Sequence, residues 1–340
     1  MTHYKVGIIG YGWAARRHLA AINATSLARV TSIYSSRPLE QAALDAEHGP
    51  GLRAFNDLPA FLAQDDLAVV SICSLPHLHA RHAVAAAEAG KHLIIERPAG
   101  MNHEECSAVR QAVFNAGVRA CVCFPQRHSR LVRAIKSALD AGLLGRIHYA
   151  EVDFCENHGP PHHQSRWNAF RRDGGSSLLL AGCQALDVLL LFMGLDVKAV
   201  SSYATHSSAR QFAGFEFPTT SVTLLKYHDG RLAKVTSCVD ALRPPGLSIR
   251  LFGSEGCLAD RQVCLGPSSS AAPLQWTDLA EHLPDLKEPA DDPLKTMLED
   301  FLRATAQNQE APLTNLREAL NTHEVLFAAE RSAQRHEGKS

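Results

Sequence analysis

A glycine turn between the first predicted strand and the first predicted helix constrains the fold more than any other feature of this sequence. An apolar, β-rich run at residues 5–9 leads into Gly-Tyr-Gly-Trp-Ala-Ala at residues 10–15, where a helical pattern begins. In such a G-x-G-x-x-A turn, the first glycine permits the bend, the second admits a pyrophosphate, and a small sixth residue lets the helix pack on the strand. The helix N-terminus offers N–H donors to phosphates. We therefore expect dinucleotide contacts from Gly10, Tyr11, Gly12, Trp13 and Ala14.

The first third of the chain alternates strands with helices. Further strands are predicted at residues 29–34, 68–73, 92–95 and 119–123. Helices are predicted at residues 13–23, 39–47, 58–63, 79–89 and 104–116. Nearly continuous apolar strands that alternate with helices require a parallel sheet covered on both faces. Residues 1–123 are therefore predicted to form a doubly wound α/β domain of the Rossmann type. This context favours dinucleotide binding at residues 10–15, and a glycine turn that binds no ligand is the alternative.

The pattern changes in the rest of the chain. Helices are predicted at residues 131–141, 177–193, 293–308 and 316–334. Strands are predicted at residues 147–155, 199–204, 219–227, 232–239 and 248–252, with a hairpin turn at His228-Asp229-Gly230 and a loop at 266–273. Strands segregated from helices favour an antiparallel sheet. Residues 124–340 are therefore predicted to form an α+β domain with an open, mostly antiparallel sheet.

Charge and cysteine usage exclude several classes of protein. Lys and Arg number 34 against 35 Asp and Glu, a balance that argues against binding nucleic acid through a basic surface. The most apolar stretch, 177–194, contains Gln184 and Asp187, so we expect no membrane span of ~18 residues. The nine cysteines show no paired spacing. The first residues run directly into a strand-like segment, so we expect no signal peptide. We expect a cytoplasmic protein with reduced thiols.

The end of the second strand bears on the choice of dinucleotide. NAD enzymes usually have an acidic residue here, which accepts hydrogen bonds from the ribose. This chain has Tyr-Ser-Ser-Arg at residues 34–37. Ser36 would not repel a 2′-phosphate, and Arg37 would pair with it. The sequence favours NADP, with NAD and an Arg37 that stacks on adenine as the alternative.

Several segments together resemble one family. They are GYGWAARRH, SICSLPHLHARHAVAAAEAGKHLIIERP, LLGRI, GGSSLLLAGCQALD and LEDFLRA. With these motifs the chain resembles, over nearly its full length, the glucose–fructose oxidoreductase / inositol dehydrogenase (Gfo/Idh/MocA) family. The resemblance implies a Rossmann domain followed by an open-faced domain that holds a sugar-like substrate against the nicotinamide. It also implies a homodimer or homotetramer built on the open sheet.

Two departures from the family pattern concern proton transfer. Glu96-Arg97-Pro98 stands where the family has Glu-Lys-Pro, and residues 180–184, Leu-Ala-Gly-Cys-Gln, stand where it has Asp-x-Gly-x-His. The family's lysine and histidine act near the reacting carbinol. Arg97 stays charged and cannot act as a base, and Gln184 has no ionisable group. We expect Arg97 to polarise a carbonyl and Gln184 to hydrogen-bond a hydroxyl.

The usual proton donor is therefore missing, and a histidine-containing loop at residues 156–163 offers a substitute. By the resemblance this loop lies near the substrate, so His158 or His163 would be the acid–base group. A solvent-exposed loop is the alternative. Metal binding by His158, His162 and His163 is disfavoured because no cysteine or carboxylate completes a ligand set. We expect no metal.

The resemblance also supplies the remaining site residues. Beside the cofactor it places Ser74, Leu75, His79, Glu96 and Arg97. Beside the substrate it places Arg127, Trp167, Arg171, Arg172 and Cys183. His18 and His79 match family positions but are expected to be structural. Asp187 lies in an apolar helix on the same face as Leu180 and Gln184, and is expected either to serve the site or to pair with an arginine.

Three functions remain open at this point. The leading interpretation is an NADP(H)-dependent oxidoreductase that acts on a sugar, cyclitol or related small molecule. The second is a catalytically degenerate protein that still binds the dinucleotide. The third is a non-redox lyase or glycosidase that works through a transient keto intermediate on a tightly bound nicotinamide cofactor.

Overall fold

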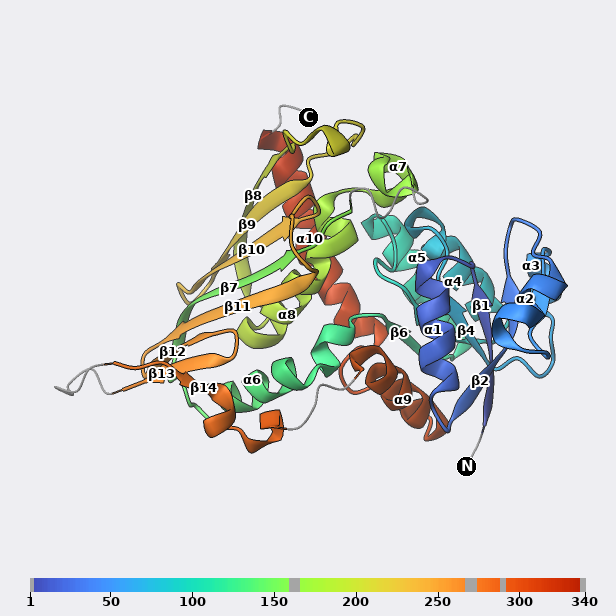
Figure 1. Ribbon diagram of the computed structural model, residues 1–340, viewed down its shortest axis with the longest axis horizontal. Helices are drawn as coiled ribbons and strands as arrows, with labels where there is room; N and C mark the ends of the chain where they lie inside the picture. Colours follow the sequence, from blue (N-terminus) through green and yellow to red (C-terminus); the bar gives the residue numbers. More distant parts are fainter. Residues whose placement is uncertain (1–2, 159–165, 267–273, 288–291, 337–340) are drawn as a thin grey trace. The chain divides into compact units, whose positions relative to one another are not determined.

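The computed structural model describes residues 3–158, 166–266, 274–287 and 292–336, which Figure 1 draws as coloured ribbon. The chain divides into two compact units. The first unit comprises Met1–Pro125 and Asp292–Leu320, and the second comprises Gln126–Asp291 and Asn321–Ser340. The expected single boundary after residue 123 does not describe this division, because a late segment returns to the first unit. Its apolar residues Met297, Leu298 and Phe301 belong to the same buried cluster as Ile22 and Ile33.

The first unit is built on a parallel six-stranded sheet in the order β3-β2-β1-β4-β5-β6. Its strands are β1 (Tyr4–Ile9), β2 (Ala28–Tyr34), β3 (Arg53–Phe55), β4 (Val69–Ile72), β5 (His92–Ile95) and β6 (Ala120–Val122). Its helices are α1 (Trp13–Asn23), α2 (Gln41–His48), α3 (Leu58–Leu62), α4 (His79–Glu88), α5 (His103–Ala116) and α9 (Pro293–Ala306). The predicted Rossmann architecture is confirmed. The strand order reverses between β1 and β4, the point at which such sheets bind dinucleotides.

The second unit contains an eight-stranded sheet in the order β14-β13-β12-β11-β7-β10-β9-β8. Its strands are β7 (Ile147–Cys155), β8 (Val197–Thr205), β9 (Thr220–Tyr227), β10 (Leu232–Cys238), β11 (Gly246–Gly253), β12 (Gly256–Ala259), β13 (Gln262–Leu265) and β14 (Thr277–Asp278). Every pair is antiparallel except β7 with β10. The predicted hairpin joins β9 to β10, with Gly230 at φ +91°. The predicted open-faced, mostly antiparallel sheet is confirmed.

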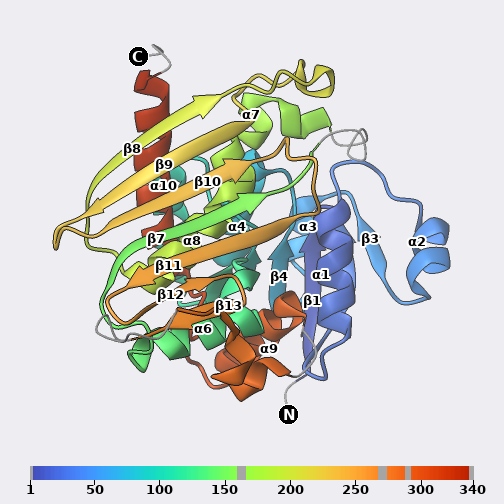
Figure 2. The same ribbon diagram turned by 60° about the vertical axis from the view of Figure 1, so that its left-hand side comes forward.

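Helices α6 (Arg130–Asp140), α8 (Cys183–Met193) and α10 (Leu316–His336) lie on one face of this sheet (Figure 2). Along β9 the burial alternates strictly, with Ser221, Thr223 and Leu225 buried and Val222 and Leu224 exposed. This period of two shows that the opposite face of β9 is not covered by the described residues.

The long apolar helix has two geometries. Its first part, Leu178–Gly182, is a π-helix, and α8 continues from it. Gly182 is required because a Cβ atom there would collide with the Ser237 side chain of β10. The stretch Arg171–Met193 is long and apolar enough to cross a membrane by length and composition, but 83% of its most apolar window is buried inside the protein. Core helices of soluble proteins pass the same test.

Candidate active site

The glycine turn of the first unit has the features that a pyrophosphate requires. Gly10 adopts φ +98°, and a Cβ there would lie 2.6 Å from the Cys73 carbonyl oxygen, so only glycine fits. A Cβ on Gly12, in contrast, would meet nothing within 4 Å. Gly12 is also the N-cap of α1, and no side chain caps that helix. The first N–H groups of α1 are therefore left for an anion.

The other residues of the turn are held differently. The Tyr11 hydroxyl donates to Glu47 (2.8 Å) and lies 2.7 Å from His48 Nε2, and the Arg16 guanidinium stacks on its ring. Trp13 is 71% exposed and carries Arg17 on its face. Ala14 is half-buried. Tyr11 thus braces the turn against α2, whereas Trp13 remains on the surface.

The segment after β2 offers cationic and neutral groups. Ser36 and Arg37 are both exposed, and the Arg37 backbone N–H donates to Ser35 Oγ (3.1 Å). Residues 34–37 carry no carboxylate. Arg37 is therefore an exposed cation with no ion pair to the described carboxylates, and it lies where Rossmann domains bind the adenosine ribose.

Two histidines, His79 and His82, contact Ser74, which lies just after the end of β4. His79 is buried, with its ring nitrogens 2.7 Å from the Pro98 carbonyl and 2.9 Å from the Ser74 carbonyl. Burial lowers the pKa of His79. Ser74 Oγ lies 2.9 Å from His82 Nδ1, and Leu75 precedes a 3₁₀ turn. His79 therefore faces backbone in this unit, and its ring ties the end of β4 to the segment after β5.

Glu96 and Arg97 form a close pair after β5. Arg97 donates to Glu96 Oε2 from its backbone N–H (3.1 Å) and its guanidinium (3.0 Å), and His18 Nε2 lies 3.1 Å from Glu96 Oε1. Burial opposes the charge of Glu96, but Arg97 and His18 together lower the pKa of this carboxyl to about 2. Arg97 is thus held against an anion as a fixed, permanently charged donor.

In the second unit, Arg127 and Asp187 are bonded to each other. The guanidinium donates in bidentate fashion from Nε (2.6 Å) and from its second terminal nitrogen (2.8 Å), and Thr322 Oγ1 donates to the same carboxylate (2.7 Å). All three side chains are buried. Of the two alternatives for Asp187, the structure shows the arginine partner. Its charge and that of Arg127 are committed to a buried pair, so neither side chain offers a free base or cation in this arrangement.

Gln184 lies one turn before Asp187 on α8 and is only 5% exposed. Its amide makes no hydrogen bond to any described residue. A side-chain amide both donates and accepts hydrogen bonds, so Gln184 is able to bind a ligand hydroxyl. Cys183 differs, because it is fully buried and its thiol donates to the Leu179 carbonyl (3.2 Å).

His158 has a carboxylate partner that the sequence analysis did not identify. Its Nε2 lies 2.7 Å from Glu156 Oε1, and its Nδ1 lies 3.5 Å from Asn168 Nδ2. The backbones of Glu156 and His158 donate to Cys238 and Val239, which extends the pairing of β7 with β10. An acidic residue two positions before a histidine in a strand extension was the available signal. His162 and His163 lie outside the described residues.

The following short helices place the two candidate arginines differently. Trp167 is half-buried in the 3₁₀ helix Arg166–Ala169. One terminal nitrogen of Arg171 is buried and has no partner among the described residues. The Arg172 side chain is 84% exposed and bonded to Asp173. Arg171 is therefore the better placed of the two to meet a ligand.

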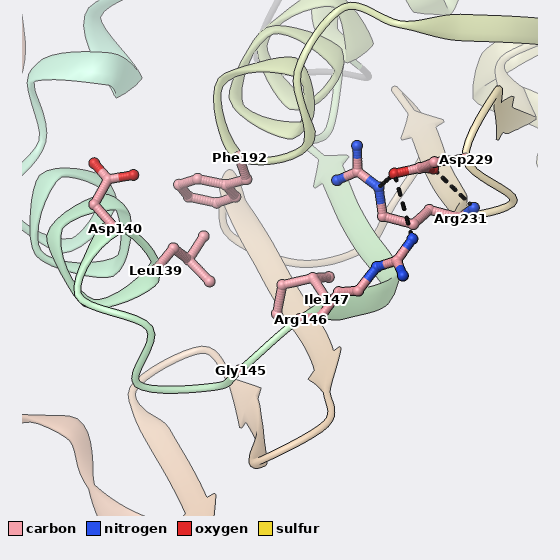
Figure 3. A pocket seen from close by; sticks show the side chains of 8 residues that line it. All are labelled: Leu139, Asp140, Gly145, Arg146, Ile147, Phe192, Asp229 and Arg231. Atoms are coloured by element: carbon pink, nitrogen blue, oxygen red, sulfur yellow. Dashed lines mark hydrogen bonds and ion pairs between the residues drawn. The ribbon is translucent and has the colours of Figure 1, made fainter.

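A separate hollow of about 230 Å³ in the second unit involves none of the predicted site residues (Figure 3). Arg231 and Arg146 line it, but both point to the Asp229 carboxylate, at 2.6 Å and 3.9 Å. Their charges are largely balanced within the hollow. It does not offer the unpaired groups that the Gln184 region does.

Comparisons with known proteins match both halves of the chain. Residues 4–124 match a family described as an oxidoreductase family with an NAD-binding Rossmann fold, and residues 132–259 match the GFO/IDH/MocA C-terminal domain.

Individual relatives are similar at lower identity. The chain is 32% identical over 154 residues to levoglucosan dehydrogenase of Pseudarthrobacter phenanthrenivorans, which covers 43% of this chain and 40% of that protein. It is 26% identical to dTDP-3,4-didehydro-2,6-dideoxy-alpha-D-glucose 3-reductase of Actinomadura kijaniata over 90% of this chain and 88% of that one. A levoglucosan dehydrogenase complex with NADH and levoglucosan shares its fold, with a TM-score of 0.83 at 21% identity over 98% of each chain.

Proposed function

The chain belongs to the GFO/IDH/MocA oxidoreductase family, and from this premise we propose that it moves hydride between NADP(H) and a carbohydrate-like alcohol or ketone. The observation that carries the proposal is the glycine turn, where Gly12 leaves open space before the uncapped N-terminus of α1. The nicotinamide supplies the hydride chemistry when it is bound. The protein's own residues have to bind the nucleotide and the substrate, orient them toward each other, and transfer the proton.

NADP rather than NAD is supported by the end of β2. Arg37 is exposed, has no acidic neighbour within residues 34–37, and follows the neutral, exposed Ser36. A guanidinium binds a phosphate by charge-assisted hydrogen bonds, which are about twice as strong as neutral ones. The 2′-phosphate of NADP would therefore bind the Arg37 guanidinium, whereas NAD has only a neutral 2′-hydroxyl at this position.

For the proton, we propose His158. Its Nε2 lies 2.7 Å from Glu156 Oε1, so the carboxylate orients the ring, and we propose Nδ1 as the atom that meets the substrate. The 3.5 Å contact of Nδ1 with Asn168 is long for a hydrogen bond, and a substrate hydroxyl would replace it.

The two departures from the family pattern then have separate roles. Gln184 would bind a substrate hydroxyl through its unpaired amide, and the fixed Arg97 guanidinium would polarise the carbonyl or stabilise the alkoxide. Arg171, with one nitrogen unpaired among the described residues, would bind a further oxygen of the substrate. A carbohydrate or cyclitol, with several hydroxyls in fixed positions, suits these donors and acceptors.

The test has two steps on the full chain. NADP⁺ and NAD⁺ are titrated into the wild type and Gly12→Ala, a variant whose new methyl meets nothing in the protein but projects into the phosphate space. We expect Gly12→Ala to lose nucleotide affinity while its melting temperature is unchanged. Turnover is then measured against a panel of sugars and cyclitols by the absorbance of the reduced nicotinamide. Failure of the wild type to bind either nucleotide would overturn the proposal.

One observation favours the second function, a catalytically degenerate protein that binds the dinucleotide without turning over a substrate. Arg97 is bound to Glu96, and Gln184 carries no titratable group, so proton transfer depends wholly on the segment after β7. Tight nucleotide binding without turnover of any member of the panel would make this second function the better one.

A further inference from the structure

Three side chains of different chemistry converge inside the first unit, and the proposed hydride transfer assigns none of the three a step of its own. His18 comes from α1, Glu96 follows β5, and Cys123 follows β6. Their Nε2, Oε1 and Sγ atoms all lie within 4.8 Å of one another. His18 and Cys123 are fully buried, and the Glu96 side chain is 15% exposed.

The spacing of these atoms fits a common metal ion. The nitrogen of His18 lies 3.1 Å from the carboxylate oxygen and 3.7 Å from the sulfur. Ligands held at the usual zinc distances of about 2.0–2.3 Å in a tetrahedron are separated by roughly 3.4–3.6 Å. Adjustments of a few tenths of an ångström would therefore bring all three atoms into coordination.

The groups behind the three ligands are arranged as an outer shell. His18 Nδ1 lies 2.8 Å from Ser71 Oγ, which leaves Nε2 to face the other two donors. The two oxygens of Glu96 have different partners. Oε1 lies beside His18 Nε2, and Oε2 accepts hydrogen bonds from Arg97. Metal-binding histidines and carboxylates are usually fixed by such outer hydrogen bonds.

We propose that His18, Glu96 and Cys123 bind a zinc ion inside the Rossmann unit. Sulfur and imidazole donors favour zinc over magnesium or calcium, which prefer oxygen alone. On binding, the Cys123 thiol and the His18 Nε2–H that faces Glu96 both give up their protons, so one thiolate and one carboxylate balance the charge of the ion and the imidazole binds through Nε2. The fourth position falls to a water molecule or to Cys73, whose sulfur lies 3.6 Å from Ser71 Oγ.

Such an ion would be structural. It would tie the first helix to the ends of β5 and β6, and it would hold the carboxylate that in turn holds Arg97. The competing explanation is a hydrogen-bonded triad with no ion, in which His18 bridges Ser71 and Glu96. The two differ in whether Cys123 ever becomes a thiolate.

Cobalt(II) distinguishes them, because a thiolate ligand gives a near-ultraviolet charge-transfer band and a tetrahedral ion gives intense visible bands. The full-length chain is stripped with a chelator and titrated with Co²⁺, and then with Zn²⁺. We expect one Co²⁺ per chain with both sets of bands, and displacement by zinc. Cys123→Ser is expected to lose the charge-transfer band. Cys121→Ser, which alters a buried cysteine of β6 outside the cluster, is expected to keep it.

Ser71→Ala tests the outer shell, and it should weaken metal affinity by about 10- to 100-fold while the bands remain. Circular dichroism checks that each variant is folded, and Cys123→Ala replaces Cys123→Ser if the latter is not. Absence of the charge-transfer band in the wild type, or an unchanged band in folded Cys123→Ser, would leave the hydrogen-bonded triad as the correct description. The nucleotide proposal rests on the glycine turn and is tested by titration of Gly12→Ala, so the two proposals fail independently.

Discussion

At the scale of single residues, the chemistry of this chain depends on side chains whose charges are free and on others whose charges are already paired. Arg97, Arg127 and Asp187 are bonded to partners, whereas Arg37 is exposed and Gln184 is buried without a partner among the described residues. A buried bidentate pair such as Arg127 and Asp187 contributes little to a new ligand, because binding would have to break that pair. Predictions about binding therefore fall on the free groups.

Arg37→Ala should weaken NADP⁺ binding selectively. Loss of a charge-assisted hydrogen bond to phosphate costs about 1.5–3 kcal/mol, or about 10- to 150-fold in Kd, and NAD⁺ has no phosphate there to lose. Isothermal titration of both nucleotides measures the difference. Arg29→Ala, an exposed arginine at the start of β2, is the matched control. Equal weakening for the two nucleotides, or a wild type that prefers NAD⁺, contradicts the assignment.

His158→Gln should lower kcat by about 10²- to 10⁴-fold, the usual contribution of a general acid–base group. Glu156→Gln should lower it less, because the imidazole remains but loses the carboxylate that orients it. Steady-state kinetics on the substrate found in the panel provides the measurement. His148→Gln, an exposed histidine on β7, should leave kcat unchanged. A change smaller than tenfold in His158→Gln would rule out this histidine.

At the scale of elements, one buried network ties three segments of the second unit together. Arg127 precedes α6, Asp187 lies in α8, and Thr322 lies in α10. Their three hydrogen bonds converge on one carboxylate, and that carboxylate lies one turn from Gln184. The network therefore fixes the face of α8 from which Gln184 projects.

Asp187→Asn should destabilise the protein by about 3–5 kcal/mol, because it leaves the Arg127 guanidinium buried without a counter-charge. Thr322→Val should cost less, about 1–3 kcal/mol, since it removes one hydrogen bond to a charged group. Denaturant unfolding followed by circular dichroism compares the midpoints. Asp196→Asn, an exposed carboxylate in the loop after α8, serves as the control. A midpoint for Asp187→Asn equal to that of the control would show that the ion pair contributes nothing.

Sequence patterns predicted most elements because their signals are local. The helix at residues 13–23 and the strand at 92–95 occur as expected. The helix follows the glycine turn at Gly12 and has an apolar period, and the strand is a short apolar run just after Gly90. The strands β3, β12, β13 and β14 were not predicted, because runs of two to four residues carry too little periodicity. The return of α9 to the first unit depends on tertiary packing, which no local pattern encodes.

The site was predictable only in part, because local sequence patterns do not encode contacts between residues that are far apart in the chain. The glycine turn is a contiguous motif, so its residues were identified from spacing alone. The partner of Asp187 was left open because Arg127 is 60 positions away, and Thr322 is 135 positions away. Glu156, the partner of His158, lies two residues from it, and only the extension of β7 places the two side chains on the same face.

At the scale of the whole molecule, the uncovered face of the second unit's sheet is the feature that a single chain leaves unexplained. Tyr203 and Val222 are cross-strand neighbours on β8 and β9, and they are 56% and 36% exposed. Leu224 and Leu232 on β9 and β10 are 49% and 51% exposed. Further along the sheet, Lys234 pairs with Glu151 and Asp153. Apolar side chains bordered by paired charges are typical of a protein interface.

We therefore expect a homodimer or homotetramer formed through this face, and its loss in the double variant Val222→Lys/Leu224→Lys. Two lysines at the centre of the patch would place unpaired charges in the interface, which costs far more than the exposed apolar area they replace. Light scattering at micromolar concentration should give a multiple of the 36.9 kDa chain mass for the wild type and the single chain mass for the variant. Leu242→Lys, which alters a leucine 83% exposed outside the sheet, should remain assembled. A monomeric wild type would show that the open face is not a self-association surface, and an assembled double variant would place the contact elsewhere.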